Sequence, residues 1–232
     1  MIYSPKRWYD RLLGVSNAKT IKGEALGYLT GILYLAPARS SGFNVCAKAS
    51  AGCEAACLFT AGRGRFSQVQ SARLAKTLAY FNDRANFMDD LRLSIRRIVR
   101  LAAKQGLKPA VRLNGTSDLP FFNSGIMAEF PKVIFYGYTK RIDFLRKSPE
   151  NLTFSRSESN RKDVDYILAN MPEVNIAVVF RGKLPAVWKG REVINGDLHD
   201  CRFLDRKGVI VGLTAKGKAK KDPSGFVVEW GN

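Results

Sequence analysis

The chain has 232 residues, of which 46% are apolar and 25% are charged, a composition typical of a folded globular protein. This length suits one large α/β domain better than two small ones, so we expect a single domain over residues 1–232. No stretch approaches ~20 uninterrupted apolar residues, which argues against a membrane-spanning helix. Pro5, Lys6 and Arg7 stand where a signal peptide needs an apolar run, so the expected location is the cytoplasm, where thiols stay reduced.

The net charge of +18 predicts an anionic partner. Self-repulsion on this scale is relieved by a polyanion, and nucleic acid is the first candidate, with an anionic membrane surface second. The alternative is a basic surface that is simply well solvated. Charge alone carries no information about which nucleic-acid sequence would be bound.

In chain order, a buried strand is expected within residues 25–35, followed by a loop at 36–66 that is rich in Gly, Ala, Ser and Cys. Apolar spacing from residue 67 to about 105 predicts a long helix with a break near Asn82 and Asp83, ended by Gly106. The remaining pattern predicts strands at 109–114, 132–138, 151–156, 174–180, 209–213 and 226–228, and helices at 124–130, 141–147 and 161–170.

Alternation of strands and helices predicts a mostly parallel sheet, either a full or partial barrel or an open doubly wound sheet. In such folds the active site lies at the carboxyl ends of the strands. The loops of interest are therefore 36–66, 114–123, 139–141, 156–160 and 181–200.

Three cysteines, Cys46, Cys53 and Cys57, are spaced as C-x6-C-x3-C within the loop at 36–66. Three thiols within so short a segment can converge on one centre, and the small residues between them let the backbone approach it closely. This pattern favours an iron–sulfur cluster. A fourth iron would then be free for Cys201, for His199 or for a ligand from solution.

Other roles for these cysteines remain open. Structural zinc usually takes four closed ligands in shorter C-x2–4-C pairs, and a four-thiolate site would have to recruit Cys201 from far along the chain. Disulfides are disfavoured by a reducing compartment. Buried cysteines can also be inert, packing as small hydrophobic residues.

Two basic segments are candidates for nucleic-acid contact. Arg63 and Arg65 alternate with glycines directly after the cysteines and can grip phosphate. Lys216, Lys218 and Lys220 form a Gly-broken turn after a late strand and can clamp a polyanion. For both segments a solvated turn without function is the competing interpretation.

The order of three motifs resembles a known family. The wide-spaced cysteine loop is followed by Arg-Leu-Asn-Gly-Thr-Ser-Asp at 112–118 and by Tyr-Thr-Lys-Arg at 138–141, and this resembles phage-encoded gene-product-88-like proteins. More distantly, residues 28–180 look like radical S-adenosylmethionine enzymes of the spore-photoproduct-lyase type. The cysteine spacing is wider than that superfamily's usual C-x3-C-x2-C, and Ala56 stands where an aromatic residue precedes its third cysteine.

This resemblance implies a partial (β/α) barrel, radical-S-adenosylmethionine-like, with mostly parallel strands. It implies a [4Fe–4S] cluster on the cysteine loop, whose open iron S-adenosylmethionine would chelate. In this chain the ligand pocket would be formed after the second strand, with Asp118 on the ammonium group, and at two later strand ends, by Asn114, Gly115, Thr116, Ser117, Asp118, Thr139, Lys140, Ser155, Arg156 and Ser157.

The resemblance also bears on substrate and location. An enzyme of this kind would act here on nucleic acid or a nucleotide, and a phage-encoded protein would work in the host cytoplasm. The alternative is a non-catalytic iron–sulfur or zinc protein that binds nucleic acid. Binding of S-adenosylmethionine separates the two hypotheses.

Overall fold

The computed structural model describes residues 7–57, 59 and 62–230. Residues 1–6 and 231–232 of the expected domain, and 58 and 60–61 of the expected cysteine loop, lie outside the described residues. Within the described part no helix is long and apolar enough to cross a membrane.

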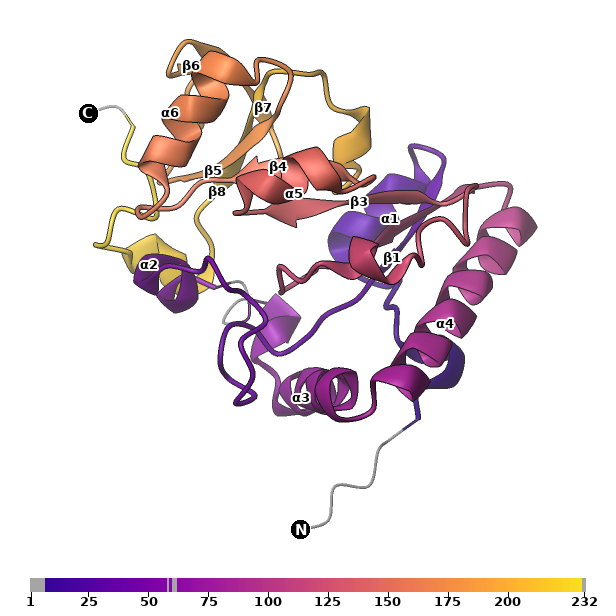
Figure 1. The fold of residues 1–232 in the computed structure, drawn as a ribbon. Helices are drawn as coiled ribbons and strands as arrows, with labels where there is room; N and C mark the ends of the chain where they lie inside the picture. The colour runs from indigo at the N-terminus through magenta and orange to yellow at the C-terminus, as the bar shows by residue number, and fades with distance from the viewer. Residues whose placement is uncertain (1–6, 58, 60–61, 231–232) are drawn as a thin grey trace.

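The centre of the molecule is a mostly parallel sheet (Figure 1). Its order in the described residues is β1-β2-β3-β4-β5-β8-β7-β6, with two free edges, so the sheet is not closed. All neighbours pair in parallel except β6 and β7. The strands are β1 (Tyr28–Ile32), β2 (Lys108–Arg112), β3 (Ile134–Thr139), β4 (Asn151–Ser155), β5 (Ile176–Phe180), β6 (Val187–Trp188), β7 (Arg191–Asn195) and β8 (Ile210–Thr214).

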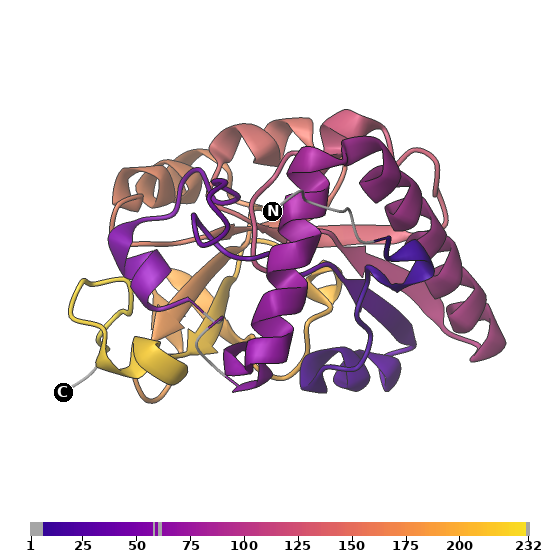
Figure 2. The same ribbon diagram turned by 90° about the horizontal axis from the view of Figure 1, so that it is seen from below.

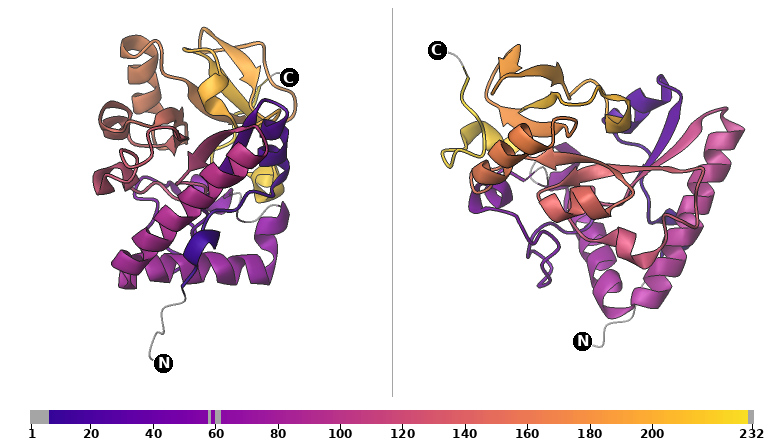
Figure 3. Two further views of the ribbon diagram at one scale, coloured as in Figure 1. Left: turned by 90° about the vertical axis from the view of Figure 1, so that its right-hand side faces the viewer. Right: turned by 45° about the horizontal axis from the view of Figure 1, so that its top comes forward.

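Apart from α1, which precedes β1, the α-helices of this fold lie between successive parallel strands. They are α1 (Ala18–Glu24), α2 (Ala51–Ala55), α3 (Ser67–Asn82), α4 (Arg84–Lys104), α5 (Ile142–Lys147) and α6 (Arg161–Asn170), and short 3-10 turns occur at Tyr9–Arg11, Gly62–Arg65, Phe121–Ser124, Arg202–Leu204 and Gly217–Lys221. In Figure 2, α6, α5 and α4 form an arc along one side, and α3 crosses the face turned toward the viewer. Figure 3 shows from two more directions that α3 and α4 meet at an angle.

The long helical pattern is confirmed, including its break. Asp83 has non-helical backbone angles and separates α3 from α4. Helix α4 then buries a stripe against β1 and β2 at three- to four-residue spacing, formed by Phe87, Leu91, Ile95, Ile98 and Ala102. Gly106 follows in the left-handed conformation (φ 68°), as expected for a residue just beyond a helix.

Two expected elements are wrong, and four were not predicted, one of them helix α2 within the segment expected to be a loop. Residues 124–130 form no α-helix, because Gly125 adopts a left-handed conformation (φ 72°) that ends the short turn Phe121–Ser124. At 226–228 only Val228 pairs, in a single bridge with Phe180. Helix α1 and the hairpin of β6 and β7 were missed. The hairpin turns through Lys189 and Gly190, both at positive φ, as a two-residue turn of the primed type requires.

Candidate functional site

One cavity of about 580 Å³ lies at the carboxyl ends of the parallel strands. Every strand from β1 to β5, and β8, contributes a residue from its last positions, namely Ile32, Arg112, Tyr138, Ser155, Val179 and Leu213. In a flat sheet the first and last of these six strands would lie ~24 Å apart. Their joint lining of one cavity therefore means that the sheet curves around it. This is the edge of the sheet at which an active site was expected.

All three loop cysteines line this cavity and are half-buried. Cys46 Sγ donates to the carbonyl oxygen of Thr116 at 3.6 Å. Cys53 lies in α2, where its backbone N–H bonds to the Oγ of the capping residue Ser50 at 3.2 Å. Helix α2 is tied to the loop after β4, because the N–H of Gly52 donates to Glu158 at 2.8 Å. The cysteine loop thus has a defined position over the strand ends.

Burial governs the charge state of these thiols. Burial, together with the neighbouring Cys57 and Cys53, raises the pKa of Cys46 to about 12. Burial also raises the pKa of Cys53, against which Lys140 acts, and that of Cys57. The thiols are therefore neutral until a cation displaces their protons. In the described part of the chain no three His, Cys, Asp or Glu side chains form a ready ligand set. The donor chemistry fits a thiolate-bound cluster, although the ligands are not preassembled.

The loop after β2 supplies a second wall of the cavity. Asn114, Gly115, Thr116, Ser117 and Asp118 all line it. The amide of Asn114 ties the loop together, accepting from Ser117 Oγ at 2.8 Å and from Leu119 N at 3.0 Å. Gly115 is required sterically, because a Cβ there would lie 2.6 Å from the carbonyl oxygen of Leu33.

Asp118 is the acidic group of this wall. Its Oδ2 accepts the backbone N–H of Lys140 at 2.9 Å, whereas its Oδ1 is buried without a hydrogen-bond partner. Burial raises its pKa, although Lys140 and Thr139 oppose the shift. Thr139, Lys140 and Ser155 line the same cavity, and Lys140 Nζ donates to Ser155 Oγ at 3.0 Å. The cysteine loop and three successive strand ends are therefore brought together.

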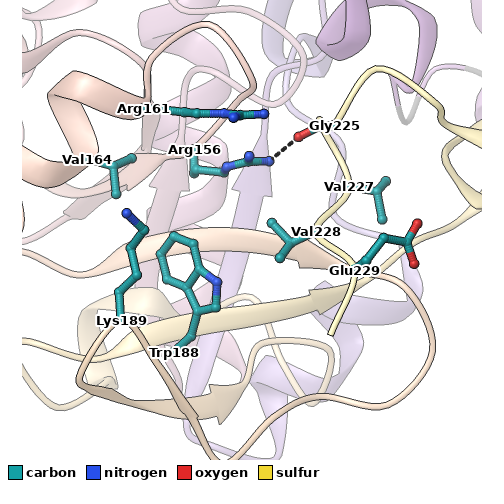
Figure 4. A pocket seen from close by; sticks show the side chains of 9 residues that line it. All are labelled: Arg156, Arg161, Val164, Trp188, Lys189, Gly225, Val227, Val228 and Glu229. Carbon is teal, nitrogen blue, oxygen red and sulfur yellow. Dashed lines mark hydrogen bonds between the residues drawn. The ribbon is translucent and has the colours of Figure 1, made fainter. Parts of the chain in front are cut away.

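Arg156 and Ser157 do not line this cavity. Arg156 borders a separate cavity of about 380 Å³ on the other side of β4, beside Arg161 and Trp188 (Figure 4). Its Nη1 donates to the carbonyl oxygens of Gly225 and Phe226, at 2.5 and 2.7 Å. Ser157 is fully buried in the following turn. Arg156 lies one residue beyond β4, and its bonds to the segment 225–226 hold its guanidinium at that other cavity.

Cys201 also lies away from the cysteine loop. It is 1% exposed and does not line the cavity, and burial raises its pKa to about 11, a shift that Thr30 of β1 opposes. His199 Nδ1 lies 3.0 Å from Nη2 of Arg202. The same segment does reach the cavity through Asp197 and Asp200.

Sequence reasoning missed a buried polar network in the cavity wall. Arg112 Nη1 lies 3.2 Å from each carboxylate oxygen of Asp200, and the hydroxyl of Tyr136 donates to Asp200 at 2.9 Å. The Arg112 guanidinium lies over the ring of Tyr138, 4.6 Å from its centroid. Burial, reinforced by Asp200, raises the pKa of Tyr138 to about 12. Arg112 at the end of an apolar strand was a signal that could have indicated this network. Nothing in the local sequence indicates its partner Asp200, which lies 88 residues away.

The basic residues named for nucleic acid surround the cavity. Arg63 and Arg65 are exposed on the turn Gly62–Arg65, whose two glycines line the cavity. Lys216 lines it as well and pairs with Asp197 at 2.6 Å. Lys218 and Lys220 are exposed on the adjoining turn Gly217–Lys221. These cations therefore belong to the same face as the cysteines.

Comparison with known proteins identifies the family. The model of the family described as Gene product 88 matches residues 11–229. The chain belongs to the Gene product 88 family. The searches of curated proteins and of solved structures found no match. For this Gene product 88 protein the resemblance to gene-product-88-like proteins is confirmed, whereas the similarity to radical S-adenosylmethionine enzymes stays a prediction.

Proposed function

We propose that this Gene product 88 protein holds a [4Fe–4S] cluster through Cys46, Cys53 and Cys57 and uses S-adenosylmethionine to act on nucleic acid or a nucleotide. The observation that carries the proposal is the shared cavity. Three cysteines from one loop line it together with the motifs after β2, β3 and β4, which is the arrangement that the resemblance implies. The sequential order of the parallel strands from β1 to β5 supports it further.

The cysteine set favours three protein ligands over four. Cys201 is buried against Thr30 and does not line the cavity, so a four-thiolate zinc site would require a rearrangement of that segment. Three thiolates leave one iron of a cubane without a protein ligand. Lys140, which lowers the pKa of Cys53, supplies positive charge beside the thiolates.

The pocket residues present groups complementary to S-adenosylmethionine. When bound, the cluster and S-adenosylmethionine together would supply reductive cleavage to methionine and a 5′-deoxyadenosyl radical. Asp118 Oδ1, buried without a partner, is the acceptor for the ammonium group. Lys140 and Ser155, joined at 3.0 Å, are the donors for the carboxylate or ribose. Arg156 has no part in this pocket, because it borders the other cavity.

A non-catalytic iron–sulfur protein that binds nucleic acid is the second candidate. The wide cysteine spacing and Ala56 favour it, because Ala56 offers no aromatic ring for an adenine. The exposed cations around the cavity are compatible with both candidates.

Cleavage of S-adenosylmethionine separates the two candidates. The reconstituted protein is reduced with dithionite, S-adenosylmethionine is added, and 5′-deoxyadenosine is quantified. We expect product, and we expect Asp118→Asn to lower its rate about 10- to 100-fold with iron content unchanged, because a charge-assisted hydrogen bond is lost. Asp143→Asn, at an exposed ion pair with Arg141, is the control and leaves the rate unchanged. An intact cluster with neither cleavage nor calorimetric binding of S-adenosylmethionine selects the non-catalytic candidate.

A further inference from the structure

Among the described residues that line the cavity, one guanidinium has buried nitrogens without a hydrogen-bond partner. Four cations of the described residues line it. Arg112 is paired with Asp200, Lys216 with Asp197, and Lys140 bonds to Ser155. Arg73, which projects from α3, has its Nε and Nη1 buried without a hydrogen-bond partner. Arg73 is therefore the one of these four whose buried N–H groups lack an acceptor within the described protein.

The surroundings of Arg73 are aromatic. Its guanidinium carbon lies 4.9 Å from the ring centroid of Tyr34 and 5.8 Å from that of Phe59. Tyr34 itself lines the cavity, and its hydroxyl accepts from Asn17 Nδ2 at 3.2 Å. These rings hold the guanidinium plane in place but accept no N–H bond of ordinary strength. A buried donor without an acceptor is costly, so an acceptor is expected from the ligand.

We propose that Arg73 binds an oxyanion of the substrate, and that this oxyanion is a phosphate group of a nucleotide. The proposal rests on the proposed function and names its substrate class. A guanidinium matches phosphate oxygens with several N–H groups at once. A volume of about 580 Å³ is in the range of small-molecule sites, and the lining includes the aromatic side chains of Tyr34, Tyr138 and Phe226.

The charges of the cavity also orient such a ligand. Asp118 Oδ1 is the other unpartnered group among those that line it. Asp118 acts on the pKa of Cys46, and Arg73 acts on that of Cys57, so the two lie beside different cysteines of the loop. An ammonium group bound at Asp118 and a phosphate bound at Arg73 would therefore lie near different cysteines of the loop.

Paired ligands test the proposal. Anaerobically reconstituted protein is titrated calorimetrically with adenosine 5′-monophosphate, with adenosine and with S-adenosylmethionine. We expect the wild type to bind the monophosphate more tightly than adenosine. Arg73→Gln should weaken binding of the monophosphate about 10- to 100-fold and leave binding of adenosine unchanged. Arg73→Lys keeps the charge and should retain part of the preference. Arg100→Gln, at an exposed position of α4, is the matched control.

Iron content and thermal unfolding of each variant identify the reason for any failure. Equal affinities of the wild type for the two ligands, or no binding of either, overturn the proposal. Loss of iron in Arg73→Gln overturns it too, because Arg73 then serves the cluster. If Arg73→Gln weakens only the binding of S-adenosylmethionine, Arg73 contacts the carboxylate of that ligand, and the nucleotide assignment is overturned. If wild-type protein carries no iron, the proposed function fails, yet the phosphate preference is still measured on the protein as purified.

Discussion

Charged residues in the cavity divide into those that the protein neutralises and those that it leaves open. Arg112 and Asp200 satisfy each other across the sheet, as Lys216 and Asp197 do at its edge. Asp118 Oδ1 and two nitrogens of Arg73 have no such partner. Buried polar atoms without partners are rare in folded proteins. We therefore interpret the paired residues as wall and the unpaired ones as ligand contacts.

Glu150 makes stability depend on pH outside the cavity. Its Oε1 accepts from Ser148 Oγ at 3.2 Å, and its Oε2 is buried without a hydrogen-bond partner. Burial, with a contribution from Asp118, raises its pKa from 4.5 to about 7. Because the folded-state pKa is the higher one, the stabilisation is complete below pH ~4.5 and is lost as the pH rises through about 7.

Glu150→Gln should remove this dependence. Relative to the wild type, we expect the variant to gain stability between pH 5 and 8, by at most about 3 kcal/mol in the free energy of unfolding. Thermal unfolding of both proteins across that range measures the effect. Glu24→Gln, at an exposed position of α1, is the control and should follow the wild type. Parallel curves for Glu150→Gln and the wild type would show that Glu150 keeps an ordinary pKa.

Sequence reasoning at this scale depended on local pattern. The cysteine spacing and the residues after β2 and β3 all prove to line one cavity. Arg156 was assigned to the pocket with its neighbour Ser155, but its guanidinium bonds to the carbonyl oxygens of Gly225 and Phe226, far along the chain. The pairing of Arg112 with Asp200, and the burial of Arg73 beside Tyr34, result from contacts between distant segments that no local pattern records.

Strand ends and the loops that follow them position the site. The end of β1 and the loop after β2 approach so closely that a Cβ at Gly115 would lie 2.6 Å from Leu33 O and 2.8 Å from the Tyr34 ring. The backbone of Leu33 is held in the sheet by its bond to Arg112 O at 2.9 Å, so it cannot simply yield. Gly115 thereby sets the width of the cavity between these elements.

Gly115→Ala should push the two elements apart. We expect a loss of about 1–3 kcal/mol in the free energy of unfolding, as for other overpacked sites, and weaker ligand binding through the displaced Tyr34. Gly14→Ala is the matched control, because the nearest atom to its Cβ would be 3.9 Å away. Denaturant unfolding of both variants gives the comparison. A Gly115→Ala protein as stable as Gly14→Ala would mean that the loop relaxes freely.

Elements were predicted where periodicity is long and flanked by clear signals. Helices α3 and α4, with the break at Asp83, and α6 followed from apolar spacing. Short elements were not predicted. Strand β6 has two residues, and β7 alternates without a strongly apolar face, so neither rises above a loop pattern. The mostly parallel sheet followed from β/α alternation, whereas the order of its strands did not.

Net charge is a property of the whole molecule. The exposed side chains Arg63, Arg65, Lys218 and Lys220 lie at turns beside the cavity, where they concentrate part of the +18 charge on one face. Such a face attracts a polyanion at long range. This agrees with the proposed nucleotide or nucleic-acid substrate, whose phosphates would meet these cations before reaching the cavity.

Nucleic-acid binding should be steeply salt-dependent. Each neutralised phosphate contributes about 0.7–0.9 to the log–log slope, so the double variant Arg63→Gln and Arg65→Gln should lower the slope by roughly 1.5 and weaken binding to all sequences alike. Fluorescence anisotropy over a salt series measures this, with Arg96→Gln and Arg100→Gln on α4 as the charge-matched control. Failure to bind DNA or RNA, single- or double-stranded, at low salt would remove nucleic acid as the polymeric partner.

The central claim is that Cys46, Cys53 and Cys57 hold an iron–sulfur cluster in the cavity, and analysis of iron, sulfide and zinc in anaerobically purified protein tests it most directly. We predict brown protein with broad absorption near ~400 nm and about four irons and four sulfides per chain. Changing any of the three cysteines to alanine should abolish the iron, whereas Cys201→Ala should retain it. Colourless wild-type protein with one zinc per chain would contradict the account, as would loss of iron in Cys201→Ala.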